Sequence, residues 1–392
     1  MGYSGRMPWK ATSEMNERTV MINEYLSGDY SVAELARRRG ISRKTAHKWI
    51  GRYRADPAGG LGDQSRAPHH HPNALAPGLE QAILAWKARR PSWGAPKIHS
   101  KLWDDPACPA ESTVSNVLRR HGLSRRLRRR ARATPNAEPW IEAGSSNEVW
   151  CTDFKGWFCL GDGRRCDPLT ISDACSRYLL CCQGITGTTG WVAVRPLFER
   201  VFREYGLPLR MRSDNGAPFA SRGLGGLSPL AVWWLRLGIG LERIAPGHPE
   251  QNGRHERMHR TLKEAVPVQG TLGRQQRAFD AFRQDYNEER PHEALGQKPP
   301  ASAYAPSPRD FPERLLVVEY PDDWVKRRVR SNGEIRWRGE KVYISQSLID
   351  QWIGLQPVAD GLWGLYFMTE QLGQLDERKT TPRVRPLTRN QP

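Results

Sequence analysis

Two aspartates occupy positions in expected strands where an apolar side chain would be usual. Asp153 follows the largely apolar run 149–152 in a segment that should be a central strand, and Asp214 ends another strand just before Asn215 and Gly216. A buried carboxylate without a partner is costly, so such residues usually meet a cation. Asp214 alone would fit a simple turn, but the two aspartates together predict a divalent metal site. Mg²⁺ (or Mn²⁺) suits such oxygen ligands, because it keeps waters and phosphate oxygens in its shell.

A third carboxylate, supplied by a helix, would complete a site for two ions. Two such ions can activate a nucleophile and stabilise the leaving oxygen in a displacement at phosphorus. Glu250 is one candidate, but it lies at the start of an expected helix, where a glutamate is more often a partner of the helix dipole. Glu256 lies inside that helix and shares a face with Arg260 and Lys263, which would point with it at a phosphate. We therefore favour Glu256.

The elements that must position these residues follow one another in an order typical of an α/β domain. We expect strands at 149–154, 167–171, 178–182, 209–214 and 241–244, and helices at 191–205, 229–237, 250–264 and 272–287. The first three strands are consecutive, and helices then alternate with strands. This order predicts an α/β, ribonuclease H-like core over residues 146–300.

The first 56 residues are expected to form an all-α helix-turn-helix unit. Ser31 and Glu34 form a capping-box pattern, and Ser42 is placed to cap the next helix after a tight turn. That second helix carries basic residues that could contact DNA: Arg43, Lys44, His47, Lys48 and Arg52. The alternative is a plain helical hairpin with a solvated basic face.

A second helical DNA-binding unit is predicted over 78–124, between a linker at 57–77 and a basic linker at 125–145. Three consecutive histidines in the first linker cannot all converge on one metal ion, so they predict no zinc site. The second linker contains an arginine tract: Arg125, Arg126, Arg128, Arg129, Arg130 and Arg132. A run of like charge this dense is either disordered or laid on phosphates, and its place beside a DNA-binding unit favours phosphates.

The C-terminal part of the chain changes character again. A Pro-rich linker is expected over 301–314. Short strand signals at 334–338, 341–344 and 362–367 then predict a small β-barrel over 315–378. The last segment, 379–392, is expected to be disordered.

The charge of the chain limits the class of partner. Among 392 residues, 60 Lys and Arg face 42 Asp and Glu, which gives a formal charge of +18 and a pI near 9.9. A balance this basic points first to nucleic acid, so double-stranded DNA is the expected partner. No run of about 18 apolar residues is present, so no membrane span is expected. Seven cysteines without a C-x-x-C pair argue against disulfides and favour the cytoplasm, with the protein on the bacterial nucleoid when it binds DNA.

Three segments resemble the D-D-E signature of the integrase-core transposases, the insertion-sequence relatives of retroviral integrases. They are residues 150–155 (WCTDFK), 212–219 (RSDNGAPF) and 246–263 (PGHPEQNGRHERMHRTLK). Residues 286–295 (YNEERPHEAL) resemble the family's segment that closes the catalytic core, and 170–178 (TISDACSRY) resembles the corner between its second and third strands. The resemblance covers about 145–320 and extends more loosely to the N-terminal helical units.

The resemblance implies that Asp153, Asp214 and Glu256 are the metal ligands. The family's third carboxylate follows an Asn-Gly pair by three positions, as Glu256 follows Gly253. The usual spacing in the superfamily would instead choose Glu250, and a Gly-rich insertion at 221–228 would account for the longer gap to Glu256. The chain also departs from retroviral integrases in having helix-turn-helix units where those proteins have a zinc module.

The resemblance further implies a metal-dependent polynucleotidyl transferase that uses two Mg²⁺ or Mn²⁺ ions. A metal-activated water would cut each element end, and the freed 3′-hydroxyl would then be joined to target DNA. Side chains that could help hold phosphates are Lys155, Asn252, His255, Arg260 and Lys263. Joining two ends implies a homodimer or a larger assembly on the DNA.

Two other functions fit part of the sequence. A DNA-binding regulator could use the integrase-like core as an inactive scaffold, although a scaffold has no reason to keep three carboxylates. A ribonuclease H-like nuclease could hydrolyse DNA without joining it, although two DNA-reading units favour a protein that binds element ends.

Overall fold

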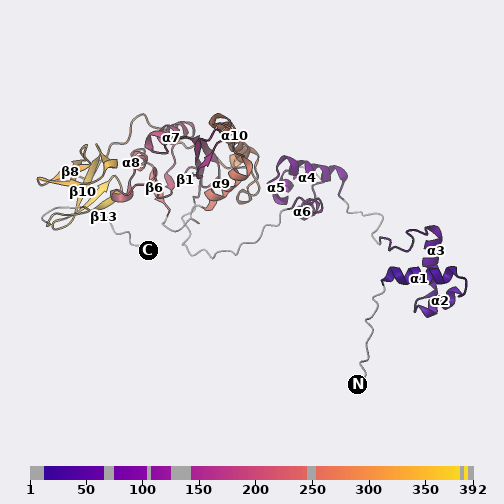
Figure 1. Cartoon of the computed structure of the whole chain (residues 1–392). Helices are drawn as coiled ribbons and strands as arrows, with labels where there is room; N and C mark the ends of the chain where they lie inside the picture. The colour runs from indigo at the N-terminus through magenta and orange to yellow at the C-terminus, as the bar shows by residue number, and fades with distance from the viewer. Residues whose placement is uncertain are drawn as a thin grey trace, which may run out of the picture. The chain divides into compact units, whose positions relative to one another are not determined.

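The computed structural model describes residues 13–65, 75–103, 107–124, 143–244, 253–379 and 384–386 (Figure 1). Contacts between Cα atoms divide the chain into two compact units, Met1–Ala74 and Leu75–Pro392. Within the described ranges, every helix is too short or too polar to traverse a lipid bilayer.

The first unit is a three-helix bundle that contains the expected helix-turn-helix. Its helices are α1 (Glu14–Leu26), α2 (Val32–Arg38) and α3 (Arg43–Ala55). Both predicted caps are present: Ser31 Oγ accepts from the Glu34 amide at 3.3 Å, and Ser42 Oγ accepts from the Thr45 amide at 3.1 Å. One core joins the three helices through Met21, Ile22, Ala36, Ala46, Trp49 and Ile50. The helix-turn-helix prediction is therefore confirmed.

The second unit begins with three more helices around a small core. They are α4 (Pro77–Arg89), α5 (Ala95–Ser100) and α6 (Glu111–Arg120). Trp93, which is 1% exposed, stacks on Trp86 with ring centroids 5.8 Å apart. Ile83, Ile98 and Val114 bring one buried side chain from each helix against it.

A mixed sheet forms the centre of the second unit. Its strands are β1 (Val149–Phe154), β2 (Phe158–Cys159), β3 (Arg165–Asp173), β4 (Leu179–Ile185), β5 (Arg210–Ser213) and β6 (Gly240–Arg243). β1 pairs antiparallel with β3 on one side and parallel with β5 on the other. β3 also pairs antiparallel with β4 and with the short β2, and β6 extends the parallel edge beyond β5. All five expected strands are present, and β2 is an addition.

Helices cover both faces of this sheet: α7 (Trp191–Tyr205), α8 (Pro229–Arg236), α9 (Gly253–Ala265) and α10 (Leu272–Gln284). On one face Trp150 packs with Phe198 of α7 and Trp234 of α8. On the other face Leu179 packs with Met258 of α9 and Phe279 of α10. Helix, sheet and helix thus form three layers, which confirms the expected α/β, ribonuclease H-like core.

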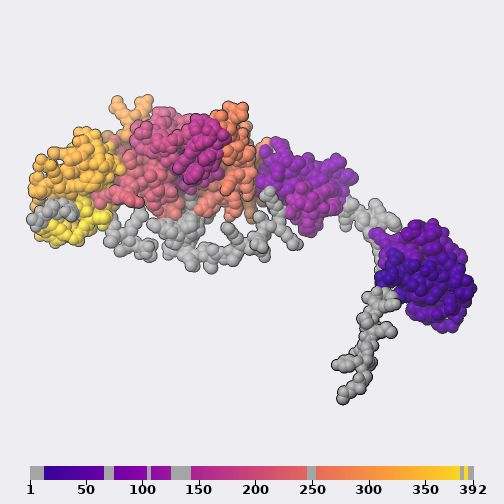
Figure 2. Space-filling model, in the orientation of Figure 1, coloured from indigo at the N-terminus to yellow at the C-terminus, as the bar shows by residue number. Residues whose placement is uncertain are grey.

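Helix α8 is apolar around most of its circumference because it is buried on two sides. Leu230 and Trp234 face the core of the sheet, whereas Val232 and Leu235 join the core of the C-terminal strands. A helix that is hydrophobic all round is expected to be fully buried. The C-terminal strands, orange to yellow in Figure 2, therefore pack directly on the α/β core.

The C-terminal region is rich in strands. They are β7 (Val325–Arg328), β8 (Glu334–Trp337), β9 (Glu340–Tyr343), β10 (Trp352–Ala359), β11 (Leu362–Phe367), β12 (Glu370–Asp376) and β13 (Val384–Pro386). Five of them form a sheet in the order β13-β12-β11-β10-β7, and β8 pairs only with β9 among the described strands. Within the described residues no pairing joins β13 to β7, so the β-rich domain is confirmed but the closed barrel is not.

One expectation for the C-terminal half needs correction. Residues 384–386 were expected within a disordered tail, but β13 pairs with the outer edge of β12, where it satisfies backbone groups that would otherwise be open. The Pro-rich linker at 301–314 lies against the core: the Ser307 amide donates to the Tyr205 carbonyl at 2.8 Å, and Phe311 packs on Phe202.

Short helical turns complete the described chain. They are η1 (Leu224–Gly226), η3 (Asp285–Glu289), η4 (Glu293–Leu295), η5 (Pro300–Ser302) and η6 (Gln346–Leu348).

Candidate active site

The pairing of β1 with β5 brings two carboxylates together. Val149 lies beside Arg210 and Cys151 beside Arg212 in this parallel pair. The same register, continued by two residues, sets Asp153 beside Asp214, where both strands approach their carboxyl ends. Both side chains are half-buried. Asp214 Oδ1 also accepts from the Gly216 amide at 3.1 Å, which fixes the turn that follows β5.

Glu256 approaches this pair from the first turn of α9, where its side chain is exposed. The charges of Asp214 and Glu256 both act on Asp153. The pKa of Asp153 is raised to about 7, first by burial and then by the charges of Asp214 and Glu256, against a backbone hydrogen bond from Phe154 that lowers it. A carboxyl with such a pKa gains strongly from a cation placed beside it.

A divalent ion would fit the chemistry of this donor set, because all three groups offer carboxylate oxygens and repel one another without a cation. The three carboxylates do not form a closed metal site in this structure, however. Within the described ranges, no three His, Cys, Asp or Glu side chains converge closely enough to hold a metal ion. Binding an ion would therefore require small side-chain movements, which the exposed Glu256 can make.

Two histidines of α9 fix this helix to the sheet. His255 is 2% exposed, and its Nε2 and Nδ1 atoms lie 2.7 Å from Thr170 Oγ1 and 2.9 Å from Ser172 Oγ. His259 Nε2 lies 2.7 Å from the same Thr170 Oγ1, which itself donates to the Asp153 carbonyl at 3.1 Å. Burial lowers the pKa of both imidazoles, to about 4 for His259. His255 was expected to hold a phosphate, but as placed it anchors the helix that carries Glu256.

These polar anchors were missed in the sequence. Thr170 and Ser172 lie in a strand that reads as an apolar run with small polar interruptions, and only the pairing of β3 beneath α9 gives them partners. Asp173, which is 1% exposed, was also missed. It accepts from the Ser176 amide and the Asn147 amide, both at 2.7 Å, and so closes the corner between β3 and β4.

Three of the predicted phosphate-binding cations lie on α9 or just after β1. Arg260 and Lys263 are exposed on this helix, and Lys155 is half-buried two residues after Asp153. Burial lowers the pKa of the Lys155 ammonium, and the nearby charge of Lys263 lowers it further. Asn252 and Glu250 lie outside the described residues.

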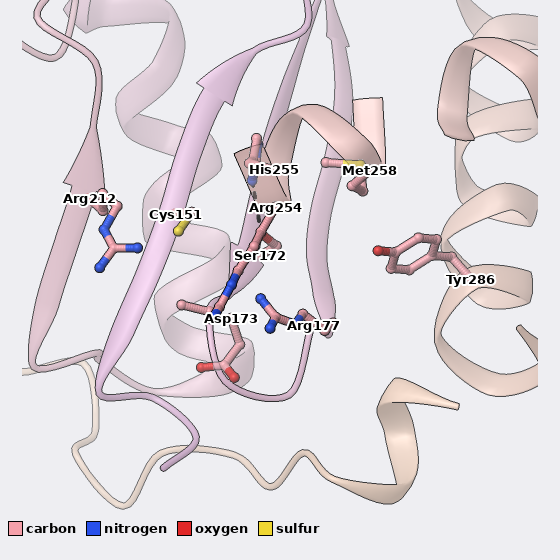
Figure 3. A pocket seen from close by; sticks show the side chains of 10 residues that line it. Cys151, Ser172, Asp173, Arg177, Arg212, Arg254, His255, Met258 and Tyr286 are labelled. Atoms are coloured by element: carbon pink, nitrogen blue, oxygen red, sulfur yellow. Dashed lines mark hydrogen bonds between the residues drawn. The ribbon is translucent and has the colours of Figure 1, made fainter. Parts of the chain in front are cut away.

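A small cavity beside the site differs from it in chemistry (Figure 3). It measures about 20 Å³, which is room for roughly one or two waters. Arg177 and Arg254 face it together with Tyr286, and none of the three carboxylates lines it. Arg177 Nη1 is buried and has no hydrogen-bond partner within the described part of the chain, so a water there would satisfy it.

In the first unit, the basic residues of α3 are displayed as a DNA-binding helix requires. Arg43, Lys44, His47 and Lys48 are exposed. Arg52 is half-buried: its guanidinium donates to Gln64 Oε1 at 2.9 Å and lies 5.0 Å from the Trp49 ring centroid. The predicted arginine tract, Arg125, Arg126, Arg128, Arg129, Arg130 and Arg132, lies outside the described residues.

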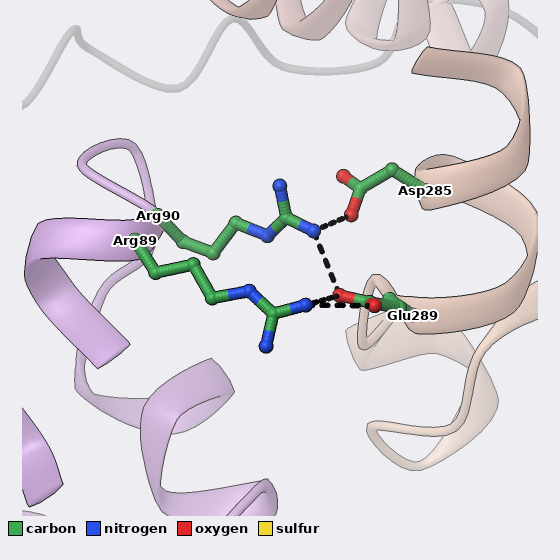
Figure 4. Close-up of polar contacts among 4 residues, drawn as sticks. All are labelled: Arg89, Arg90, Asp285 and Glu289. Atoms are coloured by element: carbon green, nitrogen blue, oxygen red, sulfur yellow. Dashed lines mark hydrogen bonds and ion pairs between the residues drawn. The ribbon is translucent and has the colours of Figure 1, made fainter. Parts of the chain in front are cut away.

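In the second unit, ion pairs tie α4 to the end of the α/β core (Figure 4). Arg89 donates to Glu289 at 3.0 Å, and Arg90 donates to the same carboxylate at 2.7 Å and also pairs with Asp285. The Lys97 ammonium donates to the Pro291 carbonyl, and burial lowers its pKa to about 8. The 286–295 segment therefore holds the preceding helical unit against the core.

Family comparisons match almost the whole described chain. Residues 144–249 and 237–300 each match an integrase core domain family. Residues 17–69 match a helix-turn-helix domain family, and 45–118 match a homeodomain-like domain family. Residues 325–383 match the C-terminal domain of IS481 family transposases.

Several solved structures are similar in parts. A simian T-cell lymphotropic virus intasome in complex with a regulatory subunit of PP2A matches 74% of this chain and 97% of its own at 16% identity, with a TM-score of 0.36. The integrase catalytic core domain of HTLV-2, in complex with magnesium, matches 41% of this chain and 99% of its own at 13% identity, with a TM-score of 0.32.

Sequence relatives come from insertion elements. An uncharacterised 31.7 kDa protein of insertion element IS407 from Burkholderia multivorans is 30% identical over 256 residues, which are 63% of this chain and 88% of the relative. The InsD transposase of insertion element IS2 from Escherichia coli is 26% identical, over 53% of this chain and 70% of the relative. Integrase core, helix-turn-helix units and transposase C-terminal domain occur here in one polypeptide, and the chain belongs to the integrase-core transposases of insertion sequences.

Proposed function

We propose that this transposase cleaves the ends of its insertion sequence and joins them to target DNA at a site formed by Asp153, Asp214 and Glu256. The register of β1 and β5 carries this proposal, because it puts two carboxylates side by side at the carboxyl ends of central strands. The charge of Glu256 contributes to the raised pKa of Asp153, after burial and the charge of Asp214, and this supports Glu256 as the third group.

These three side chains would hold two Mg²⁺ or Mn²⁺ ions. Bound there, such ions would lower the pKa of a water and neutralise charge that develops on the leaving oxygen. In the first reaction, a water oxygen bonds to phosphorus and the P–O3′ bond breaks, which frees a 3′-hydroxyl. In the second, that hydroxyl bonds to a target phosphorus and displaces a target 3′-oxygen, which takes up a proton. Neither reaction uses a covalent protein intermediate.

Basic side chains near the carboxylates would hold the phosphates during both reactions. Lys155, Arg260 and Lys263 are suited to the non-bridging oxygens, and Asn252 is a further candidate. His255 would act indirectly, by keeping α9 in place. Glu250 stays the alternative third ligand.

The DNA would be selected by the helical units. We propose that residues 1–56 and 78–124 bind the element ends, with Arg43, Lys44, His47, Lys48 and Arg52 on α3 and the arginine tract of the 125–145 linker on phosphates. The remaining proposed boundaries are a linker at 57–77, the catalytic core at 146–300, a linker at 301–314 and the β-rich domain from 315. Two ends must be joined together, so a homodimer or larger assembly is expected on DNA.

The test is metal-dependent nicking and joining of a duplex taken from the flanks of the gene. Wild type is compared with Asp153→Asn, Glu250→Gln and Glu256→Gln. Joined products that require Mg²⁺ or Mn²⁺, and that disappear with Asp153→Asn and Glu256→Gln but not with Glu250→Gln, are the expected result. Loss with Glu250→Gln and survival with Glu256→Gln would move the third ligand to Glu250.

Two other outcomes would favour different functions. Tight binding without cleavage under any metal would favour a DNA-binding regulator with an inactive core. Cleavage without joined products would favour a nuclease that only hydrolyses.

A further inference from the structure

A tryptophan stands on the surface at the turn that follows the Asp153 strand. Trp157 is 60% exposed, whereas Trp150 in the same strand segment is fully buried. The turn is defined on both sides: the Lys155 amide donates to the Pro168 carbonyl at 3.0 Å, and Phe158 pairs with Cys166. Between them Gly156 adopts φ +89°, a conformation that favours glycine. The indole is therefore displayed by an ordered turn.

A fixed cation lies against this indole. The Arg165 guanidinium carbon is 5.2 Å from the Trp157 ring centroid. Two hydrogen bonds of 2.7 Å hold Arg165 to both oxygens of Asp167, which is only 4% exposed. Because that carboxylate is buried, Arg165 cannot swing freely away from the ring. Lys155 is placed similarly, with its ammonium 5.4 Å from the centroid of the neighbouring Phe158 ring.

We propose that Trp157 is a stacking platform for an unpaired DNA base next to the phosphate that is cut. Exposed aromatic rings beside cations bind single-stranded nucleic acid, because bases stack on the ring while the cations contact the backbone. Trp157 is four residues from Asp153, so their Cα atoms are at most about 15 Å apart, which is within a few nucleotides of the proposed reaction site. The Arg165 guanidinium against the ring favours a nucleic acid over an apolar protein surface as the occupant.

This inference rests on the proposed function, and its test separates the two. The probe is an element-end duplex with 2-aminopurine at one of the last three positions, bound without metal to the Asp153→Asn protein. Stacking quenches the fluorescence of 2-aminopurine. Quenching is expected with Trp157 and with Trp157→Phe but not with Trp157→Ala, which should also bind about 5- to 150-fold more weakly. Trp352→Ala, which removes a 48% exposed tryptophan from the C-terminal sheet, is the matched control and should quench fully.

A native thiol provides a second measurement that does not depend on the indole. Cys159, the one exposed cysteine of the seven, pairs with Arg165 across β2 and β3. The Cys159 thiolate should displace a small thiol from a mixed disulfide tethered to the DNA end and so become linked to the DNA, in wild type and in Trp157→Ala alike. That result, together with lost quenching, would show a folded turn and correctly placed DNA without a stacked base.

Three outcomes would count against the inference. Unchanged quenching in Trp157→Ala would overturn the stacking inference and leave the proposed function standing. The stacking inference would also be overturned if wild type cuts the duplex but Cys159 never forms the disulfide, because the DNA would then not pass beside this turn. A wild-type protein that neither binds nor cuts the element end would overturn the proposed function, and the inference would fall with it.

Discussion

Removing the charge of Asp153 should stabilise the metal-free protein, and the gain should grow with pH. The folded protein raises the pKa of this carboxyl from 3.8 to about 7. Well below pH 3.8 the group is protonated in both the folded and the unfolded chain, so it costs nothing. As the pH rises towards 7, the unfolded chain ionises more readily than the folded one, so the folded state loses relative stability. Asp153→Asn carries no charge at any pH and avoids this loss.

The size of the effect follows from the shift. A pKa difference of about three units corresponds to at most about 4 kcal/mol above pH 7, and to about 1.5 kcal/mol at pH 5. The advantage of Asp153→Asn should therefore increase by about 3 kcal/mol between pH 5 and pH 8. For a core of this size, that is a relative increase in melting temperature of roughly 6 to 12 °C.

Differential scanning calorimetry of the full chain in EDTA, at pH 5 and pH 8, measures this change. Asp322→Asn, which alters a fully exposed carboxyl in the C-terminal region, is the control and should differ from wild type equally at both pH values. Added Mg²⁺ should then stabilise wild type at pH 8 and leave Asp153→Asn unchanged. A stability difference that is the same at both pH values would refute the claim that burial and neighbouring carboxylates raise the pKa of Asp153.

Three further changes test other parts of the molecule. Glu289→Lys removes the shared partner of Arg89 and Arg90 and adds a like charge, so hydrogen exchange in α4 and α5 should accelerate; unchanged protection would mean that these ion pairs do not dock the helical unit. His255→Ala leaves the Ser172 hydroxyl without its partner and should cost about 2 to 3 kcal/mol in urea unfolding of the core, whereas a cost near zero would contradict its anchoring role. Lys48→Ala should weaken DNA binding equally for all sequences and lower the salt slope by about 1; a loss confined to one sequence would instead indicate base readout.

The sequence predicted most of the α/β core because its elements carry strong local signals. The 191–205 helix, for example, has regular apolar spacing and ends at Gly206, whose φ of +77° terminates it as expected. The C-terminal sheet was harder. β10 and β12 were missed because each mixes Gly and Gln with apolar residues, and β10 also contains Pro357. Their pairing with β11 rather than their own composition determines that they are strands.

The residues of the candidate site also differ in how far the sequence predicts them. Asp153 and Asp214 stood out because a carboxylate in an apolar strand breaks a local pattern. Thr170, Ser172 and His259 did not stand out, because each is an ordinary residue for its own strand or helix. Their role depends on how α9 crosses β3, which is a long-range contact that no short window of sequence contains.

The correction at His255 changes how the site is understood to be built. The hydrogen bonds from His255 and His259 to Thr170 and Ser172 fasten α9 to β3, and so fix where this helix presents Glu256. Thr170 Oγ1 gives its one proton to the Asp153 carbonyl, so both histidines donate to it from Nε2. Burial lowers the pKa of both imidazoles and so keeps them neutral. The histidines therefore fasten to the sheet the helix that carries Glu256.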